Sequence, residues 1–156
     1  MSNHHRRPRH LKGSDQYPNV VKVPRDQHDW WHIIFGVMNP LQIMCELNNN
    51  YLCDGIVTMR YIGRRDVHFG CSYEVHDAKS RRIKDMAWQN LFGSLSERNV
   101  VNDINNRWLD PHFIFTYQKN DTHAVTGVRS GIMDYVRSLP LHIQNATNTK
   151  LASFIL

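Results

Sequence analysis

The order of apolar and polar residues divides the chain into segments of helical or strand character. Apolar residues at helical spacing follow Asn39-Pro40, a pair that favours a helix start, and the three asparagines 48–50 end this pattern. β-branched and aromatic residues dominate 56–62 and, after the turn 63–66, they dominate 67–75. These two segments are therefore expected to be strands.

The same reasoning predicts further helices on both sides of these strands. The apolar run 30–35 predicts a short helix with Asp29 as its cap and Gly36 at its end. A second helix is expected to start at Asp77 or Ser80. Its apolar face would hold Ile83, Met86, Ala87 and Leu91. The remaining elements are a helix over 95–109, a strand over 112–117 and a helix over 128–139. This order predicts an α+β fold, a small antiparallel sheet with helices packed on one face.

Charge is concentrated at the N-terminus. The chain has 156 residues and a net charge of +5, and residues 1–13 contribute +4 of it through Arg6, Arg7, Arg9 and Lys12. The other 143 residues hold 15 basic and 14 acidic side chains and are nearly neutral. Residues 1–28 are polar and contain three prolines, so they are expected to form a flexible basic tail that attracts phosphate without specificity.

The cysteines and histidines suggest neither a disulfide framework nor a metal site. Three scattered cysteines without a CxxC pair favour a reduced protein of the cytoplasm or nucleus. No apolar run is long enough to span a membrane. None of the ten histidines falls in an HExxH or a Cys/His zinc pattern, and His4 and His5 are expected to have no role on the tail. We therefore expect no metal, no cofactor and no catalysis.

Two segments resemble the double-stranded RNA-binding domain family. Residues 39–47 (Asn-Pro-Leu-Gln-Ile-Met-Cys-Glu-Leu) are similar to its first helix, which often opens with Asn-Pro and has a Glu six residues after the proline. Residues 79–87 (Lys-Ser-Arg-Arg-Ile-Lys-Asp-Met-Ala) look like the basic start of its second helix. The resemblance covers residues 38–93 and implies an α-β-β-β-α unit.

The resemblance implies non-catalytic binding of double-stranded RNA by shape and phosphate contacts. A-form RNA displays its 2′-hydroxyls across a shallow minor groove and hides its base edges in a deep major groove. By position, Gln42 and Glu46 on the first helix would contact one minor groove. The strand connection would reach a second minor groove through Arg64, Arg65 and His68. The basic helix start would hold phosphates through Lys79, Ser80, Arg81, Arg82 and Lys84.

This interpretation divides the chain into a tail (1–28), an RNA-binding domain (29–93), and a helix-strand-helix region (94–156) that extends the domain or forms a dimer contact. Such a protein fits RNA silencing or an antiviral context.

Two alternatives stay open. The near-neutral body and the apolar segments 30–35 and 113–115 favour a protein–protein module, such as an adaptor, a viral structural or matrix protein, or a dimerising relative of the RNA-binding fold. The ten histidines leave room for a hydrolase, for example a nuclease that uses a histidine with Asp103 or Asp110.

Overall fold

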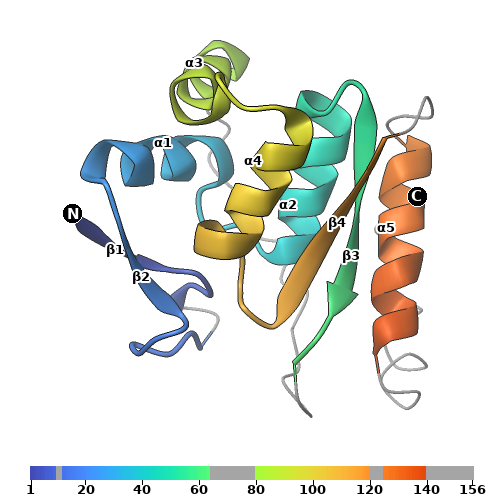
Figure 1. Ribbon diagram of the computed structural model, residues 1–156, viewed down its shortest axis with the longest axis horizontal. Helices are drawn as coiled ribbons and strands as arrows, with labels where there is room; N and C mark the ends of the chain where they lie inside the picture. The colour runs from blue at the N-terminus through green and yellow to red at the C-terminus, as the bar shows by residue number, and fades with distance from the viewer. Residues whose placement is uncertain (10–11, 64–79, 120–124, 140–156) are drawn as a thin grey trace. The chain divides into compact units, whose positions relative to one another are not determined.

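The computed structural model describes residues 1–9, 12–63, 80–119 and 125–139. These residues form helices and two separate antiparallel sheets of two strands each (Figure 1). The expected α+β class is confirmed. The chain divides into two compact units, Met1–Asn39 with Asp66–Pro111 and Pro40–Arg65 with His112–Leu156. Each unit is described by itself below.

The first unit begins with a β-hairpin and not with the expected flexible tail. Strand β1 (Ser2–His5) pairs antiparallel with β2 (Val20–Val23), with Ser2 opposite Val23 and His5 opposite Val20. The hairpin is ordered because its side chains are used inside the unit. Val23 is fully buried, and buried Arg7 forms an ion pair with buried Asp110. The basic residues at the N-terminus therefore make intramolecular contacts that a charge count does not reveal.

The described part of the first unit also contains four helical segments. They are α1 (Arg25–Phe35), α3 (Arg81–Phe92), α4 (Glu97–Asp103) and the π-helical turn η3 (Ile104–Trp108). Helix α1 starts four residues before the expected cap Asp29, directly after Pro24, and it ends at Gly36 as expected. Gly36 has a φ of 56°, a conformation that glycine adopts without strain.

Helix α3 packs against α1, and its buried face matches the expected apolar face only in part. Ser80 caps α3 by accepting a hydrogen bond from the Ile83 backbone nitrogen at 3.4 Å, as expected. Ala87 and Phe92 are its buried residues, whereas Ile83 and Met86 are 43% and 60% exposed. The sequence alone could not show which side of this helix meets a neighbour, because apolar residues occur on more than one side.

In the second unit, the residues that the structure describes form a two-stranded sheet covered by helices. Strand β3 (Gly55–Tyr61) pairs antiparallel with β4 (Phe113–Lys119), so that Gly55 lies opposite Lys119 and Tyr61 opposite Phe113. Helix α5 (Val125–Ser138) runs alongside β3 (Figure 1). Helix α2 (Pro40–Glu46) continues into the π-helical turn η2 (Leu47–Tyr51), past the asparagines that were expected to end it.

Buried Asn48 explains why this helix continues. Its side-chain nitrogen donates to the Val57 carbonyl at 2.9 Å, and its side-chain oxygen accepts from the Val57 backbone nitrogen at 2.8 Å. The amide thus pairs with strand backbone, as a buried polar group must.

The strand pairing differs from the arrangement that the RNA-binding resemblance implies. The expected partner of β3, residues 67–75, lies outside the described residues, and the partner observed for β3 is β4. Helices α2 and α3, which the resemblance joins in the single domain 29–93, belong to different units. The described helices include none that is both long and apolar enough to cross a membrane.

Candidate metal centre

Three histidines of the first unit converge on one point. His4 comes from β1, and His28 and His32 come from α1. Each offers one ring nitrogen, and the three nitrogens lie within 4.8 Å of one another. The rings of His28 and His32 have centroids 4.5 Å apart, and the His4 ring is 5.3 Å and 6.0 Å from them.

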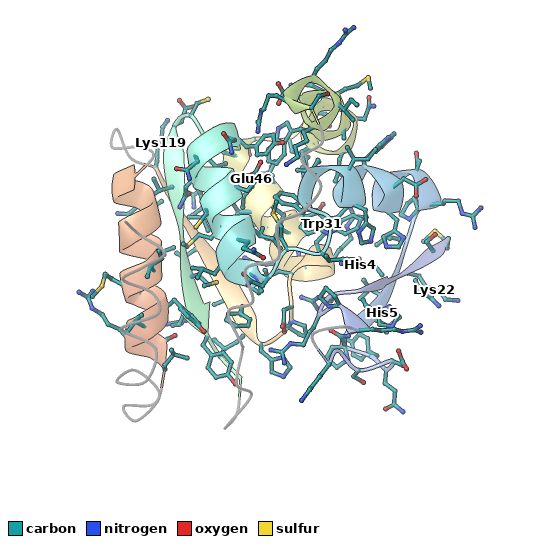
Figure 2. All side chains as sticks on the ribbon, turned by 180° about the vertical axis from the view of Figure 1, so that it is seen from behind. His4, His5, Lys22, Trp31, Glu46 and Lys119 are labelled. Atoms are coloured by element: carbon teal, nitrogen blue, oxygen red, sulfur yellow. The ribbon has the colours of Figure 1, made fainter. Side chains whose placement is uncertain are left out.

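The local structure explains this convergence. Residues four apart on an α-helix lie on the same face, so His28 and His32 point in the same direction. Neighbouring residues on a strand point to opposite faces, so His4 turns inward while His5 turns away. His4 lies close to Trp31, whereas His5 pairs with Asp15 at 2.9 Å (Figure 2).

Hydrogen bonds to backbone carbonyls fix the protonation of two of the rings. His4 Nε2 lies 3.0 Å from the Trp108 carbonyl oxygen, and His32 Nδ1 lies 3.0 Å from the Gly36 carbonyl oxygen. A carbonyl only accepts, so these two nitrogens carry the protons. The opposite nitrogens, His4 Nδ1 and His32 Nε2, are therefore unprotonated in the neutral rings and carry lone pairs.

The lone pair of His4 is buried without a partner. His4 Nδ1 is inaccessible to solvent and has no hydrogen-bond partner among the described residues. A buried polar atom in this state costs about 1–3 kcal/mol, so it requires an explanation. His28 Nε2 lies 2.9 Å from His32 Nε2. One proton lies between these two nitrogens, because two facing lone pairs would repel each other.

The electrostatics keep all three rings neutral at pH 7. Burial lowers the pKa of His4 to about 3, and the charges of His32 and His28 act in the same direction. Burial is also the main cause that lowers the pKa values of His28 and His32, against the opposing charge of Asp29. Neutral imidazole is the form that binds metal ions.

Two tryptophans form an apolar floor under His4. Trp31 and Trp108 are buried and stack with centroids 4.9 Å apart and an angle of 10° between the rings. The His4 ring meets the Trp108 ring edge-on at 4.9 Å. Such a shell holds the ring in place and keeps water away from its inner side.

The sequence analysis expects no metal site and gives no role to His4, and the structure places His4 beside His28 and His32. The available signal was the His28-x-x-x-His32 spacing, which matches one helical face. This spacing is neither a HExxH nor a Cys/His zinc pattern, and the sequence alone places His4 on an expected flexible tail, far from His28 and His32. The two aspartates of the nuclease alternative have basic partners: Asp110 pairs with Arg7, and Asp103 pairs with Arg107 at 2.8 Å.

The residues expected to bind RNA lie on α2, at the start of α3, or outside the described residues. Gln42 and Glu46 are half-buried on α2 of the second unit. Four residues lie together at the start of α3 in the first unit, namely Ser80, Arg81, Arg82 and Lys84. Arg81 forms an ion pair with Asp85 at 3.0 Å. Four residues lie outside the described residues: Arg64, Arg65, His68 and Lys79.

No protein-family model matches this chain, and no curated protein or solved structure matches it. The three-histidine cluster therefore rests on its own geometry.

Proposed function

We propose that this protein binds a divalent transition-metal ion, zinc foremost, through His4 Nδ1, His28 Nε2 and His32 Nε2. The observation that carries this proposal is the buried lone pair of His4 Nδ1, which has no hydrogen-bond partner among the described residues and belongs to a ring that clusters with His28 and His32. A metal ion would satisfy the lone pairs of His4 Nδ1 and His32 Nε2, and that of His28 Nε2 once the His28 ring carries its proton on Nδ1 instead.

The spacing of the nitrogens supports the proposal. Zinc–nitrogen bonds of about 2.0–2.1 Å in a tetrahedral arrangement place the ligand nitrogens roughly 3.3 Å apart. The nitrogens of His28 and His32 are 2.9 Å apart, and all three nitrogens lie within 4.8 Å of one another. Small rotations of the rings on α1 bring the set to coordination distance. Imidazole ligands favour zinc, copper, nickel and iron over magnesium or calcium.

The surroundings of the rings support it further. Metal-binding histidines usually donate their second ring nitrogen to a carbonyl or carboxylate, which orients the ring. The Trp108 and Gly36 carbonyls play this part for His4 and His32. Two of the three proposed ligands are thus already held in the required tautomer.

Zinc titration by isothermal calorimetry tests the proposal. The full chain is expected to bind one zinc ion, and His28→Ala or His32→Ala to weaken binding at least roughly 100-fold, since even a residue behind the ligands contributes 10–100-fold. His32 is exposed on α1, so its loss leaves the core intact. His5→Ala, on the opposite face of the same strand as His4, is the matched control. Equal affinities for all of these chains would refute the proposal.

Double-stranded RNA binding is the second candidate function. It is supported by the first turn of α3, which contains no acidic residue and exposes Arg81 and Arg82. Cations at a helix start oppose the helix dipole, and a phosphate partner would offset this cost.

Duplex titrations at two salt concentrations test the second candidate. Arg81→Ala with Arg82→Ala is expected to weaken binding to all RNA duplexes alike and to reduce the salt dependence. Lys22→Ala with Arg25→Ala removes the same charge from other exposed positions and serves as the control. Equal losses of duplex affinity in both double variants would show that the interaction is only general charge attraction. Equal binding of a DNA duplex would argue against recognition of the A-form.

A further inference from the structure

The three histidines of the cluster differ in their exposure to solvent. His4 is 3% exposed, His28 is half-buried and His32 is exposed. A metal ion on these nitrogens would therefore have its inner side covered by the His4 ring and the tryptophans behind it. Its outer side, beside His32, would face solvent.

We propose that the bound metal ion keeps one coordination position open on this outer side, where an exchangeable water is replaced by a small anion. This inference rests on the proposed metal binding and adds a ligand class to it. An open position on a metal ion also differs from the expectation, drawn from the sequence alone, of a protein with no metal and no catalysis.

The number of ligands supports an open position. Among the described residues, the cluster contains three candidate ligands and no fourth histidine, cysteine, aspartate or glutamate. Structural zinc sites are closed by four protein ligands, whereas sites with three protein ligands complete their shell with water or substrate. The neighbouring histidine, His5, is held by Asp15 and by Arg9 at 3.2 Å.

The charge of the site favours an anion as the exchanging ligand. Three neutral imidazole ligands do not themselves compensate the two positive charges of the ion, unlike thiolate ligands. Arg6 lies near enough for its positive charge to act on His4, and it is fixed by hydrogen bonds to the Leu109 carbonyl at 2.7 Å and the Asn105 carbonyl at 2.6 Å. A bound dication also makes its water more acidic, with a pKa near 7 in zinc centres of this kind. Hydroxide is then itself one of the anions that occupy the position.

Asp29 is the side chain that could close the site. It follows His28 on α1 and precedes His32 by three residues, and its charge acts on both rings. Its carboxylate is not part of the three-nitrogen cluster. A variant at this residue therefore separates a water-filled position from one that a carboxylate occupies.

The experiment is an azide titration of the cobalt-loaded full chain, followed by the visible absorption of Co²⁺. The wild type is expected to show a saturable spectral change with a single binding constant, and Asp29→Asn and His5→Ala are expected to show the same change. No change in the wild type at saturating azide would overturn the open position. A response that appears only in Asp29→Asn would overturn it as well, because the carboxylate would then be the fourth ligand. Failure of Co²⁺ and Zn²⁺ to bind at all would instead refute the proposed metal binding.

Discussion

Lowering the pH of the metal-free protein is expected to destabilise it through His4. Burial lowers the pKa of His4 to about 3 in the folded chain, against 6.5 without this burial. Above pH 6.5 both states hold the ring neutral, so the residue has no pH-dependent effect on stability there. Between pH 6.5 and 3 the unfolded chain binds one more proton than the folded chain at this residue. The free energy of unfolding therefore falls by about 1.4 kcal/mol for each pH unit removed.

The whole effect follows from the width of this window. A pKa difference of about 3.5, from 6.5 to about 3, corresponds to at most about 5 kcal/mol at 1.36 kcal/mol per unit. This is a large share of the about 5–15 kcal/mol that stabilises an ordinary domain. The folded first unit is thus expected to be much less stable at pH 4 than at pH 7.

Urea unfolding in the presence of a chelator, at several pH values, measures this loss. The buried Trp31 and Trp108 provide the fluorescence signal. Carboxylates also titrate in this range, so the wild type is compared with His4→Gln at each pH. The glutamine amide retains a donor for the Trp108 carbonyl and has no proton to gain. The stability difference between the two chains is expected to change steadily as the pH falls from 6.5. A constant difference down to pH 3 would refute the burial of a neutral His4.

Three other perturbations have expected outcomes. Zinc at roughly 100 times its Kd is expected to add about 2.7 kcal/mol to the free energy of unfolding. For 156 residues this raises Tm by roughly 5–10 °C in calorimetry, and His32→Ala should abolish the rise. Asn48→Leu removes both side-chain partners of the Val57 backbone and is expected to cost about 2–6 kcal/mol in urea unfolding; a cost below about 1 kcal/mol would contradict this. Gly131→Ala places a Cβ 2.1 Å from Met44 Sδ and is expected to cost about 1–3 kcal/mol. Combining it with Met44→Ala should recover part of that cost, and strictly additive costs would argue against the contact.

Short-range signals in the sequence located most of the elements. The sequence offers Asp77 and Ser80 as caps of one helix, because both side chains can accept from its first turn, and the structure has the hydrogen bond to Ser80. The strand 56–62 was found because β-branched residues favour an extended backbone, and β3 spans Gly55–Tyr61. Both features depend on residues within a few positions of each other.

The same short-range signals do not predict which strands pair when they lie far apart in the chain. Strand β3 pairs with β4, which lies more than fifty residues later in the chain, and the apolar pattern of β3 fits any antiparallel partner equally well. Four-residue strands such as β1 are too short to show an alternation that distinguishes them from a loop. The order of the N-terminal hairpin comes from partners about a hundred positions away, such as Asp110 for Arg7.

The proposed metal centre combines both kinds of information, and this explains why only the His28–His32 half of it is visible in the sequence. The spacing of His28 and His32 is local and follows from helix geometry. His4 joins them only because the N-terminal hairpin folds back onto the first unit, where the Trp108 carbonyl fixes its ring. The basic residues that first suggested a phosphate-binding tail are part of this fold, since Arg6 bonds the Leu109 carbonyl and Arg7 pairs with Asp110. The same contacts that remove these charges from solvent therefore bring His4 into position beside His28 and His32. Disrupting the Arg7–Asp110 pair should consequently weaken metal binding without changing any ligand.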